Sequence, residues 1–170
     1  MITVRINGEE RQYPQGATYE DVANDYQKEY DNLIALAARD GKIRELFKKL
    51  TRDCEITFFT LKDDVGNKTY VRSATMLFLK AVFDVFGRET VQNCRVEFAI
   101  GNGSYISPKG KINATEENAA KIRNRMRELV EAKTPFLKKS YSLDNAMELF
   151  RREGMKDKEK LFRYRRGSFV

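Results

Sequence analysis

The chain carries few of the residue types that enzymes use for acid–base, nucleophilic or metal chemistry. It contains no histidine, and its two cysteines, Cys54 and Cys94, are far apart and lack metal-ligand spacing. A Ser-His-Asp or Cys-His arrangement therefore cannot be built, and a zinc site is not expected. The sequence GxxxxGK(S/T) is absent, so the 170 residues hold no phosphate-binding P-loop. We predict no catalytic residues and no metal site in this chain.

Arg72 is a charged residue whose position suggests binding rather than catalysis. It belongs to segment 69–87, TYVRSATMLFLKAVFDVFG, whose apolar residues repeat with helical spacing. Met76 lies four positions later, on the same face of the predicted helix. An arginine on such a helix either pairs with a carboxylate for packing or lines a pocket for an anion. The sequence leaves both alternatives open.

Basic residues concentrate in the second half of the chain. Residues 1–62 hold 10 Lys/Arg against 11 Asp/Glu, whereas residues 63–170 hold 22 against 14, a net charge of +8. This charge is compatible with RNA, a nucleotide or an acidic protein as partner, and equally with a solvated helix face. Arginines beside an aromatic ring suit phosphates and base stacking. The predicted anion or RNA contacts are Lys121, Arg123, Arg125, Arg127, Arg163, Arg165 and Arg166, with Tyr164 among the last three.

The elements that must position these residues can be read from periodicity and turn signals. In the first 62 residues, ITVRI alternates as a strand does, and Asn7-Gly8 predicts a hairpin turn. Thr18 and Asp21 form a capping box before a short helix. Further strands are predicted at 33–38 and 54–61, and KDDVGNK (62–68) is interpreted as a linker.

The second half alternates helices and strands. The helix at 69–87 precedes strands at 94–100 and 104–107, which are joined through GNG. A helix follows Thr115, a strand is predicted at 135–142, and Ser142 caps a helix that stops at Gly154. GSFV, at the end of the sequence, has the alternation of a beginning strand. This order of elements predicts an α+β protein.

The same segments resemble a known family. Residues 1–62 resemble a TGS domain, the β-grasp (ubiquitin-like) module at the N-terminus of threonyl-tRNA synthetases. Residues 63–170 resemble the adjoining second additional domain, which edits mischarged tRNA in those enzymes. The matching segments are KDDVGNKTYVRSATMLFLKAVFDVFG, AIGNGSY and KIRNRMRELVEAKTPFLKKSYSLDNAMELFRREG. The resemblance implies two domains, 1–62 and 63–170, the second of them truncated at its C-terminus.

Two departures from that family bear on activity. The two histidines of the synthetases' HxxxH pattern are replaced here by Arg72 and Met76. Where the family has an acidic residue shortly after the tyrosine of NGSYIS, this chain has Ser107. An arginine and a thioether cannot replace two imidazoles as zinc ligands or general bases. The resemblance therefore implies a pocket that no longer edits. Its predicted residues are Arg72, Ser73, Met76, Asn102 and Tyr105.

A second resemblance concerns short segments only. TYVRS followed by KAV, and EGMKDKEKL, are similar to the N-terminal region of bacterial uridine kinase-like nucleoside kinases. In those proteins TGS and synthetase-like domains precede a P-loop kinase domain that uses ATP and magnesium. This resemblance implies a non-catalytic, ligand-sensing or substrate-positioning region of a cytoplasmic nucleoside kinase. It would itself hold no cofactor, and its ligand would be a nucleoside, a nucleotide or RNA.

Two other functions stay open at this point. One is a tRNA- or RNA-binding module of a threonyl-tRNA synthetase, or of a synthetase-like protein, with an inactive editing site. The other is a structural or dimerisation module without a ligand. A membrane partner is not expected, because no apolar run reaches the roughly 18 residues that span a bilayer. The sequence leaves the oligomeric state undetermined.

Overall fold

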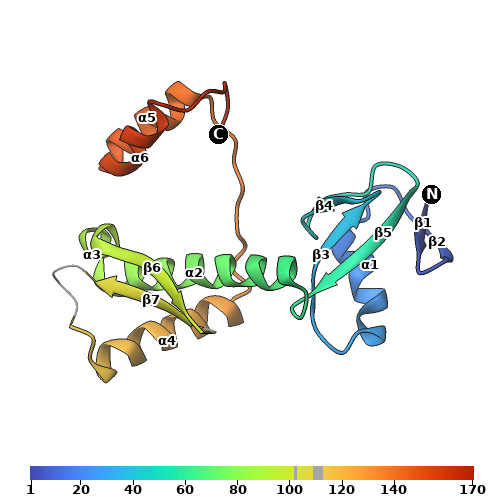
Figure 1. Cartoon of the computed structure of the whole chain (residues 1–170), viewed down its shortest axis with the longest axis horizontal. Coiled ribbons are helices and arrows are strands. Elements are labelled where there is room, and N and C mark those ends of the chain that lie inside the picture. Colours follow the sequence, from blue (N-terminus) through green and yellow to red (C-terminus); the bar gives the residue numbers. More distant parts are fainter. Residues whose placement is uncertain (102, 109–112) are drawn as a thin grey trace. The chain divides into compact units, whose positions relative to one another are not determined.

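The computed structural model describes residues 1–101, 103–108 and 113–170. The chain divides into two compact units, Met1–Met76 (unit 1) and Leu77–Val170 (unit 2). Figure 1 labels their helices and strands. A five-stranded sheet and a two-stranded sheet occur together with helices, so the predicted α+β class is confirmed. The division between the units falls within helix α2 (Asp64–Phe86), and the domain boundary predicted at 62/63 stays a prediction.

Unit 1 is built on the five-stranded sheet, with strand order β2-β1-β5-β3-β4. β1 pairs antiparallel with β2 and parallel with β5, and β3 pairs antiparallel with both β4 and β5. The elements are β1 (Ile2–Ile6), β2 (Glu9–Tyr13), α1 (Tyr19–Tyr26), the 3-10 turn η1 (Gln27–Glu29), β3 (Ile34–Arg39), β4 (Lys42–Arg44) and β5 (Cys54–Thr60).

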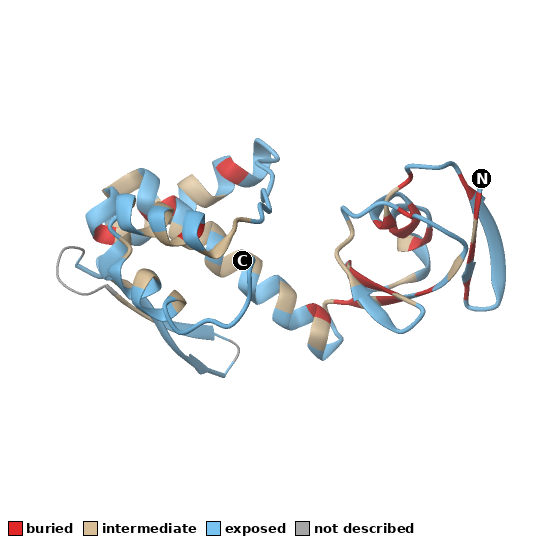
Figure 2. Ribbon diagram, turned by 90° about the horizontal axis from the view of Figure 1, so that it is seen from above, coloured by how far each residue is buried: buried red, intermediate tan, exposed pale blue. Residues whose placement is uncertain are grey.

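The core of unit 1 follows from the alternation of its strands. Ile2, Val4 and Ile6 alternate with more exposed residues along β1, so their side chains share one face of the sheet. That face packs against the apolar side of α1, including Tyr19 and Val22, which are 1% and 0% exposed. Figure 2 shows how the buried residues gather in these strands and this helix. Burial of this contiguous apolar surface is the main stabilising force available to unit 1.

Two local signals in unit 1 act as the sequence predicts. Asn7 and Gly8 have φ angles of 51° and 86°, which the tight hairpin turn between β1 and β2 requires. At the start of α1, the backbone N–H of Asp21 donates to Thr18 Oγ1 at 3.1 Å. The backbone N–H of Thr18 donates to Asp21 Oδ2 at 2.8 Å. The capping box is therefore complete and fixes where the helix begins.

The predicted linker at 62–68 is wrong, because helix α2 begins at Asp64. The Asp63 carboxylate accepts hydrogen bonds from the backbone N–H and the hydroxyl of Thr60, at 2.7 and 2.9 Å. The carbonyl of Asp63 accepts from Asn67 N at 2.8 Å, as in the first turn of a helix. Gly66 is buried, and a Cβ atom there would overlap the carbonyl of Thr60. The glycine is therefore needed for a close approach to β5 and does not mark a flexible connection.

Unit 2 combines the second half of α2 with a β-hairpin and further helices. Strands β6 and β7 pair antiparallel, with an irregularity between Val96 and Phe98 that makes Glu97 an extra residue on β6. Helices α5 and α6 pack together, and the Phe150 and Phe162 ring centroids lie 5.0 Å apart. The elements are α3 (Arg88–Asn93), β6 (Cys94–Ile100), β7 (Gly103–Pro108), α4 (Glu116–Glu131), α5 (Leu143–Arg152) and α6 (Lys156–Phe162).

In the second half, two predicted strands do not form, and two short helices were not predicted. Residues 134–141 have no regular structure, and Phe136 and Leu137 are 57% and 78% exposed. An isolated bridge joins Ser142 to Phe169, so GSFV does not form a full strand either. Apolar residues form a strand only where a neighbouring strand supplies hydrogen-bonding partners. The missed helices are α3 and α6, both shorter than two full turns.

None of the helices in the described ranges combines the length and the apolarity that crossing a bilayer requires.

Candidate functional site

Unit 2 contains a cavity of about 550 Å³ between helices α2 and α4 and the β6–β7 hairpin. Helical spacing explains its apolar walls, because Phe78 and Val82 are four residues apart on α2. Ile122 and Met126 are likewise four apart on α4. Ile106 contributes a further apolar side chain from β7. These walls suit a planar or apolar group of moderate size.

The polar residues of this cavity lie mainly at the start of α4. Thr115 caps that helix, and its hydroxyl accepts a hydrogen bond from Asn118 N at 3.2 Å. Glu116 and Arg123 pair at 3.6 Å. Burial raises the pKa of the Cys94 thiol, which keeps this sulfur protonated and poorly nucleophilic at neutral pH. The cavity therefore has groups that can bind a ligand, but no activated nucleophile.

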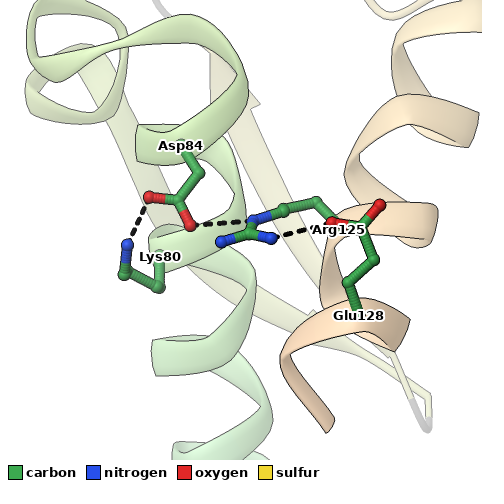
Figure 3. Close-up of polar contacts among 4 residues, drawn as sticks. All are labelled: Lys80, Asp84, Arg125 and Glu128. Carbon is green, nitrogen blue, oxygen red and sulfur yellow. Dashed lines mark hydrogen bonds and ion pairs between the residues drawn. The ribbon is translucent and has the colours of Figure 1, made fainter. Parts of the chain in front are cut away.

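An ion-pair network joins the two helices that form the cavity walls (Figure 3). Arg125 Nε on α4 donates to Asp84 Oδ2 on α2 at 2.9 Å, and Arg125 Nη1 donates to Glu128 Oε2 at 2.7 Å. Lys80 also pairs with Asp84. The hydrogen bond from Lys80, together with that from Arg125, lowers the pKa of the Asp84 carboxyl despite the opposing effect of burial. The network therefore holds α2 and α4 together through charges that persist at neutral pH.

The seven predicted anion contacts differ in how many carboxylates surround them. Lys121 pairs with Glu117 at 2.7 Å, and Arg163 pairs with Glu159 at 3.2 Å. Arg125, with its two carboxylate partners, is committed to the helix contact of Figure 3. Among described residues, no ion pair engages Arg127, Arg165 or Arg166, which are all exposed; the guanidinium of Arg165 lies 5.4 Å from the Phe162 ring centroid. These three arginines retain the most capacity to meet an external anion.

The predicted pocket residues that the structure describes are divided between the two units. Arg72, Ser73 and Met76 lie on α2 within unit 1, and Tyr105 lies on β7 in unit 2. Ser73 Oγ donates to the carbonyl of Thr69 at 3.1 Å, which is a contact within the helix. Asn102 falls outside the described residues. The pocket drawn from these residues stays a prediction, as does the choice between an ion pair and an anion pocket for Arg72.

The cavity walls escaped the sequence reading because their residues look like core. Phe78 and Val82 are among the apolar residues that repeat with helical spacing in segment 69–87, and such a stripe more often packs in a core than lines a cavity. The signal in the sequence that could have indicated the second wall is the same four-residue spacing, at Ile122 and Met126 of another predicted helix. Two such stripes predict two facing helices. They do not reveal whether the space between the helices is filled.

The geometry of the cavity does not identify a protein family, but comparison with known proteins shows which proteins the chain is similar to. No family model matches the chain. The chain is 28% identical to the threonine–tRNA ligase of Thermotoga petrophila over 99% of its length, and 29% identical to that of Maricaulis maris over 96%. It is 25% identical to the threonine–tRNA ligase of Carboxydothermus hydrogenoformans over 100% of its length. The chain is threonyl-tRNA synthetase-like. It spans about a quarter of the length of these relatives, at 27%, 25% and 28% respectively.

This similarity corrects one of our predictions. The assignment to a uridine or nucleoside kinase is wrong, because the relatives reported above, which match 96% or more of the chain, are threonine–tRNA ligases. The segments behind that assignment, TYVRS, KAV and EGMKDKEKL, lie mainly in or beside helices α2, α5 and α6. Such short helical segments specify a helix face or a helix end and carry no residue of a phosphotransfer site. The alternative interpretation, a synthetase-like module, is the one that the relatives support.

Proposed function

We propose that this chain is a tRNA-binding module of a threonyl-tRNA synthetase-like protein and that it acts in the cytoplasm. The observation that carries the proposal is the similarity to threonine–tRNA ligases along 96% or more of the chain. Charge supports it, because unit 2 holds 20 Lys/Arg against 12 Asp/Glu, a net charge of +8. A basic surface attracts nucleic acid by releasing the counterions that cover its phosphates.

We also propose that the module binds without hydrolysing. The positions that match the family's HxxxH pattern hold Arg72 and Met76, and the sequence contains no histidine. The described residues include no group of three or more His, Cys, Asp or Glu able to hold a metal ion. The ATP and magnesium that we expected belonged to the kinase assignment and are not part of this proposal. Binding alone, without a cofactor, is what these residues can supply.

For unit 1 we propose a β-grasp fold of the TGS type. The support is its strand order, in which the N-terminal hairpin pairs through β1 with β5 in parallel. One helix, α1, packs on the sheet with the buried residues Val22 and Tyr26. This is the order of elements that the resemblance to TGS domains implies. In this proposal unit 1 contributes stability and an interaction surface, while unit 2 contributes most of the positive charge.

The phosphate contacts are assigned to the arginines that have no carboxylate partner among the described residues. Arg127, Arg165 and Arg166 can each donate to a phosphate without first leaving an ion pair. Arg125 would have to break two charge-assisted hydrogen bonds, so we assign it to holding α2 against α4. Lys121, Arg123 and Arg163 are paired with neighbouring carboxylates and are expected to contribute less.

The test is a salt titration of tRNA binding by fluorescence anisotropy. We expect the affinity to fall steeply between about 50 and 200 mM salt. The R127A/R165A/R166A variant should lower the slope of log K against log salt by about one for each lost phosphate contact. The matched control removes three exposed lysines of unit 1, as K28A/K42A/K62A, and should change the slope much less.

Three results would contradict the proposal. Wild-type chain that shows no salt-dependent binding of tRNA would refute RNA binding. Self-association of a chain that ignores RNA would favour a structural module. Release of the amino acid from mischarged tRNA above the uncatalysed rate would refute the non-hydrolytic part alone.

A further inference from the structure

The outer face of the β6–β7 hairpin carries two aromatic rings that take no part in the contacts proposed above. Phe98 and Tyr105 stack with their ring centroids 5.2 Å apart and an interplanar angle of 25°. They are 58% and 48% exposed, and Ile100 beside them is 61% exposed. An isolated exposed apolar residue is ordinary, but a stacked and half-exposed aromatic pair on a sheet is not explained by the packing of unit 2.

The register of the hairpin shows which face these rings occupy. Ser104 and Ile106 line the cavity, so Tyr105, which lies between them, projects from the opposite face of β7. Phe98 is the direct partner of Tyr105 across the hairpin, because the extra residue Glu97 shifts the register after Val96. The two rings therefore lie on the face turned away from the cavity, outside the site described above.

The same face offers groups that suit a polyanion. Arg95 is the cross-strand partner of Ser107, and residues 105 and 107 share one face of β7 by alternation. The face thus combines a guanidinium, a hydroxyl, the phenol of Tyr105 and two stacked rings. It belongs to the unit that carries a net charge of +8. This charge is complementary to a nucleic-acid backbone and unfavourable for docking a second copy of the same basic surface.

We propose that this face binds single-stranded RNA by stacking an unpaired base against the Phe98–Tyr105 pair, with Arg95 placed for a neighbouring phosphate. The inference rests on the proposed function and deepens it, because it names the unpaired part of the RNA as the bound segment. Aromatic side chains on a sheet bind unpaired bases through their π-faces, and every base has such a face. The interaction is therefore strong for single strands and tolerant of sequence. A base inside a duplex is already stacked on both sides and cannot use it.

The experiment measures binding of the full chain to three RNA probes: a 12-nucleotide oligo(A), a 12-base-pair RNA duplex and tRNA. The variant F98L/Y105L keeps the face apolar and removes both rings. It should weaken oligo(A) binding by about 5- to 100-fold while leaving the duplex affinity and the salt slope nearly unchanged. The matched control is F136L, because Phe136 is 57% exposed in a segment without regular structure. Its affinity for oligo(A) should stay within about twofold of wild type.

Each other outcome decides against the inference in a distinguishable way. If wild type binds tRNA but F98L/Y105L binds oligo(A) equally well, base stacking is refuted and the proposed function stands. If wild type binds none of the probes, both are refuted. If light scattering finds a dimer that F98L/Y105L abolishes while RNA affinity is unchanged, the face belongs to a second copy of the chain.

A measurement on the wild-type chain makes the test independent of whether the variant folds. An oligonucleotide carrying 4-thiouridine is photo-crosslinked to the chain, and the attachment sites are mapped by mass spectrometry. Crosslinks at Phe98 or Tyr105 support the inference. Crosslinks confined to other residues overturn it.

Discussion

The two units of this chain bury their apolar side chains to very different extents. Among described residues, sixteen buried apolar side chains lie in unit 1 and four lie in unit 2, namely Ala81, Val82, Leu129 and Ala146. Unit 2 instead exposes large apolar residues such as Phe98, Ile100 and Leu161. Figure 2 shows the contrast as a concentration of buried segments in the unit that contains the N-terminus.

The contrast shows that the units are stabilised in different ways. Unit 1 has the contiguous core of a self-sufficient small domain. Unit 2 buries fewer apolar side chains, and ion pairs also join its helices, including Asp84 with Arg125 and Arg88 with Glu153. Its unburied apolar surface is also what makes it the better candidate for binding. Four substitutions, taken from the largest expected effect to the smallest, can break or sharpen this comparison.

The largest effect is expected for Phe58→Ala in unit 1. Phe58 is 6% exposed, and its ring contacts those of Tyr26 and Tyr30, with centroids 6.1 and 6.0 Å apart. The truncation should lower the free energy of unfolding by about 4 kcal/mol, because it opens a cavity in a dense core. This change in the free energy of unfolding is measured by urea denaturation, with hydrogen exchange of the α1 amides as the readout for unit 1. A loss below about 1 kcal/mol would contradict the description of this core as tightly packed.

The next effect is expected for Gly66→Ala at the start of α2. Alanine normally favours a helix by about 1 kcal/mol over glycine. Here its methyl group would overlap the carbonyl of Thr60, so we expect a loss of about 3 kcal/mol from the forced backbone shift. The control is Asn67→Ala, an exposed position on the same helical turn, which should be neutral or slightly stabilising. Thermal unfolding that ranks Gly66→Ala above wild type would show that the close approach is not required.

A smaller effect is expected for Leu129→Ala in unit 2. Leu129 is 6% exposed on α4, and it is the largest of the buried residues that the described part of this unit contains. We expect a loss of about 2 kcal/mol, at the low end for such truncations, because its loosely packed surroundings can collapse around the vacated space. Hydrogen exchange of α4 amides is the measurement. A loss equal to that of Phe58→Ala would remove the difference between the units.

The smallest effect is expected for Asp84→Asn, at about 1 kcal/mol. The pKa of Asp84 is lowered in the folded chain, so its stabilisation is present above the unfolded value of about 3.9 and disappears as pH falls through the folded value. Wild-type unit 2 should therefore lose stability below about pH 4. The variant should lose less over the same interval. Parallel acid titrations of both proteins, followed by hydrogen exchange of α4 amides, measure the two losses of stability. A larger loss in the Asp84→Asn variant than in wild type would contradict the prediction.

The sequence predicted most elements of unit 1, though not the short strand β4, because their signals are local. The Asn7-Gly8 turn, the Thr18–Asp21 capping box and the strand alternation each involve residues close in sequence. It failed where the deciding contact is distant in structure but ordinary in sequence. Gly66 lies among mostly polar residues, as glycines in linkers do. Only the carbonyl of Thr60 beside it explains why a glycine is needed at this position of a helix.

The site was less predictable than the fold for the same reason. The sequence shows that Arg125 is basic, but not that Asp84, 41 positions earlier, takes up its charge. It shows that Phe98 and Tyr105 are aromatic, but regular alternation would place Phe98 on the same face as Cys94. The position of the extra residue in β6 depends on pairing with β7, which no pattern within β6 encodes.

That extra residue also has consequences for how the protein can evolve. Cys94, Val96, Phe98 and Ile100 have the spacing of a single apolar face, and Glu97 divides them between two faces. Deleting Glu97 would rejoin them, turning Phe98 and Ile100 toward the cavity side of the hairpin. One codon thus separates two forms of this unit. In one, Phe98 and Ile100 would face the cavity side of the hairpin; in the present one, Phe98 stacks with Tyr105 on the opposite face.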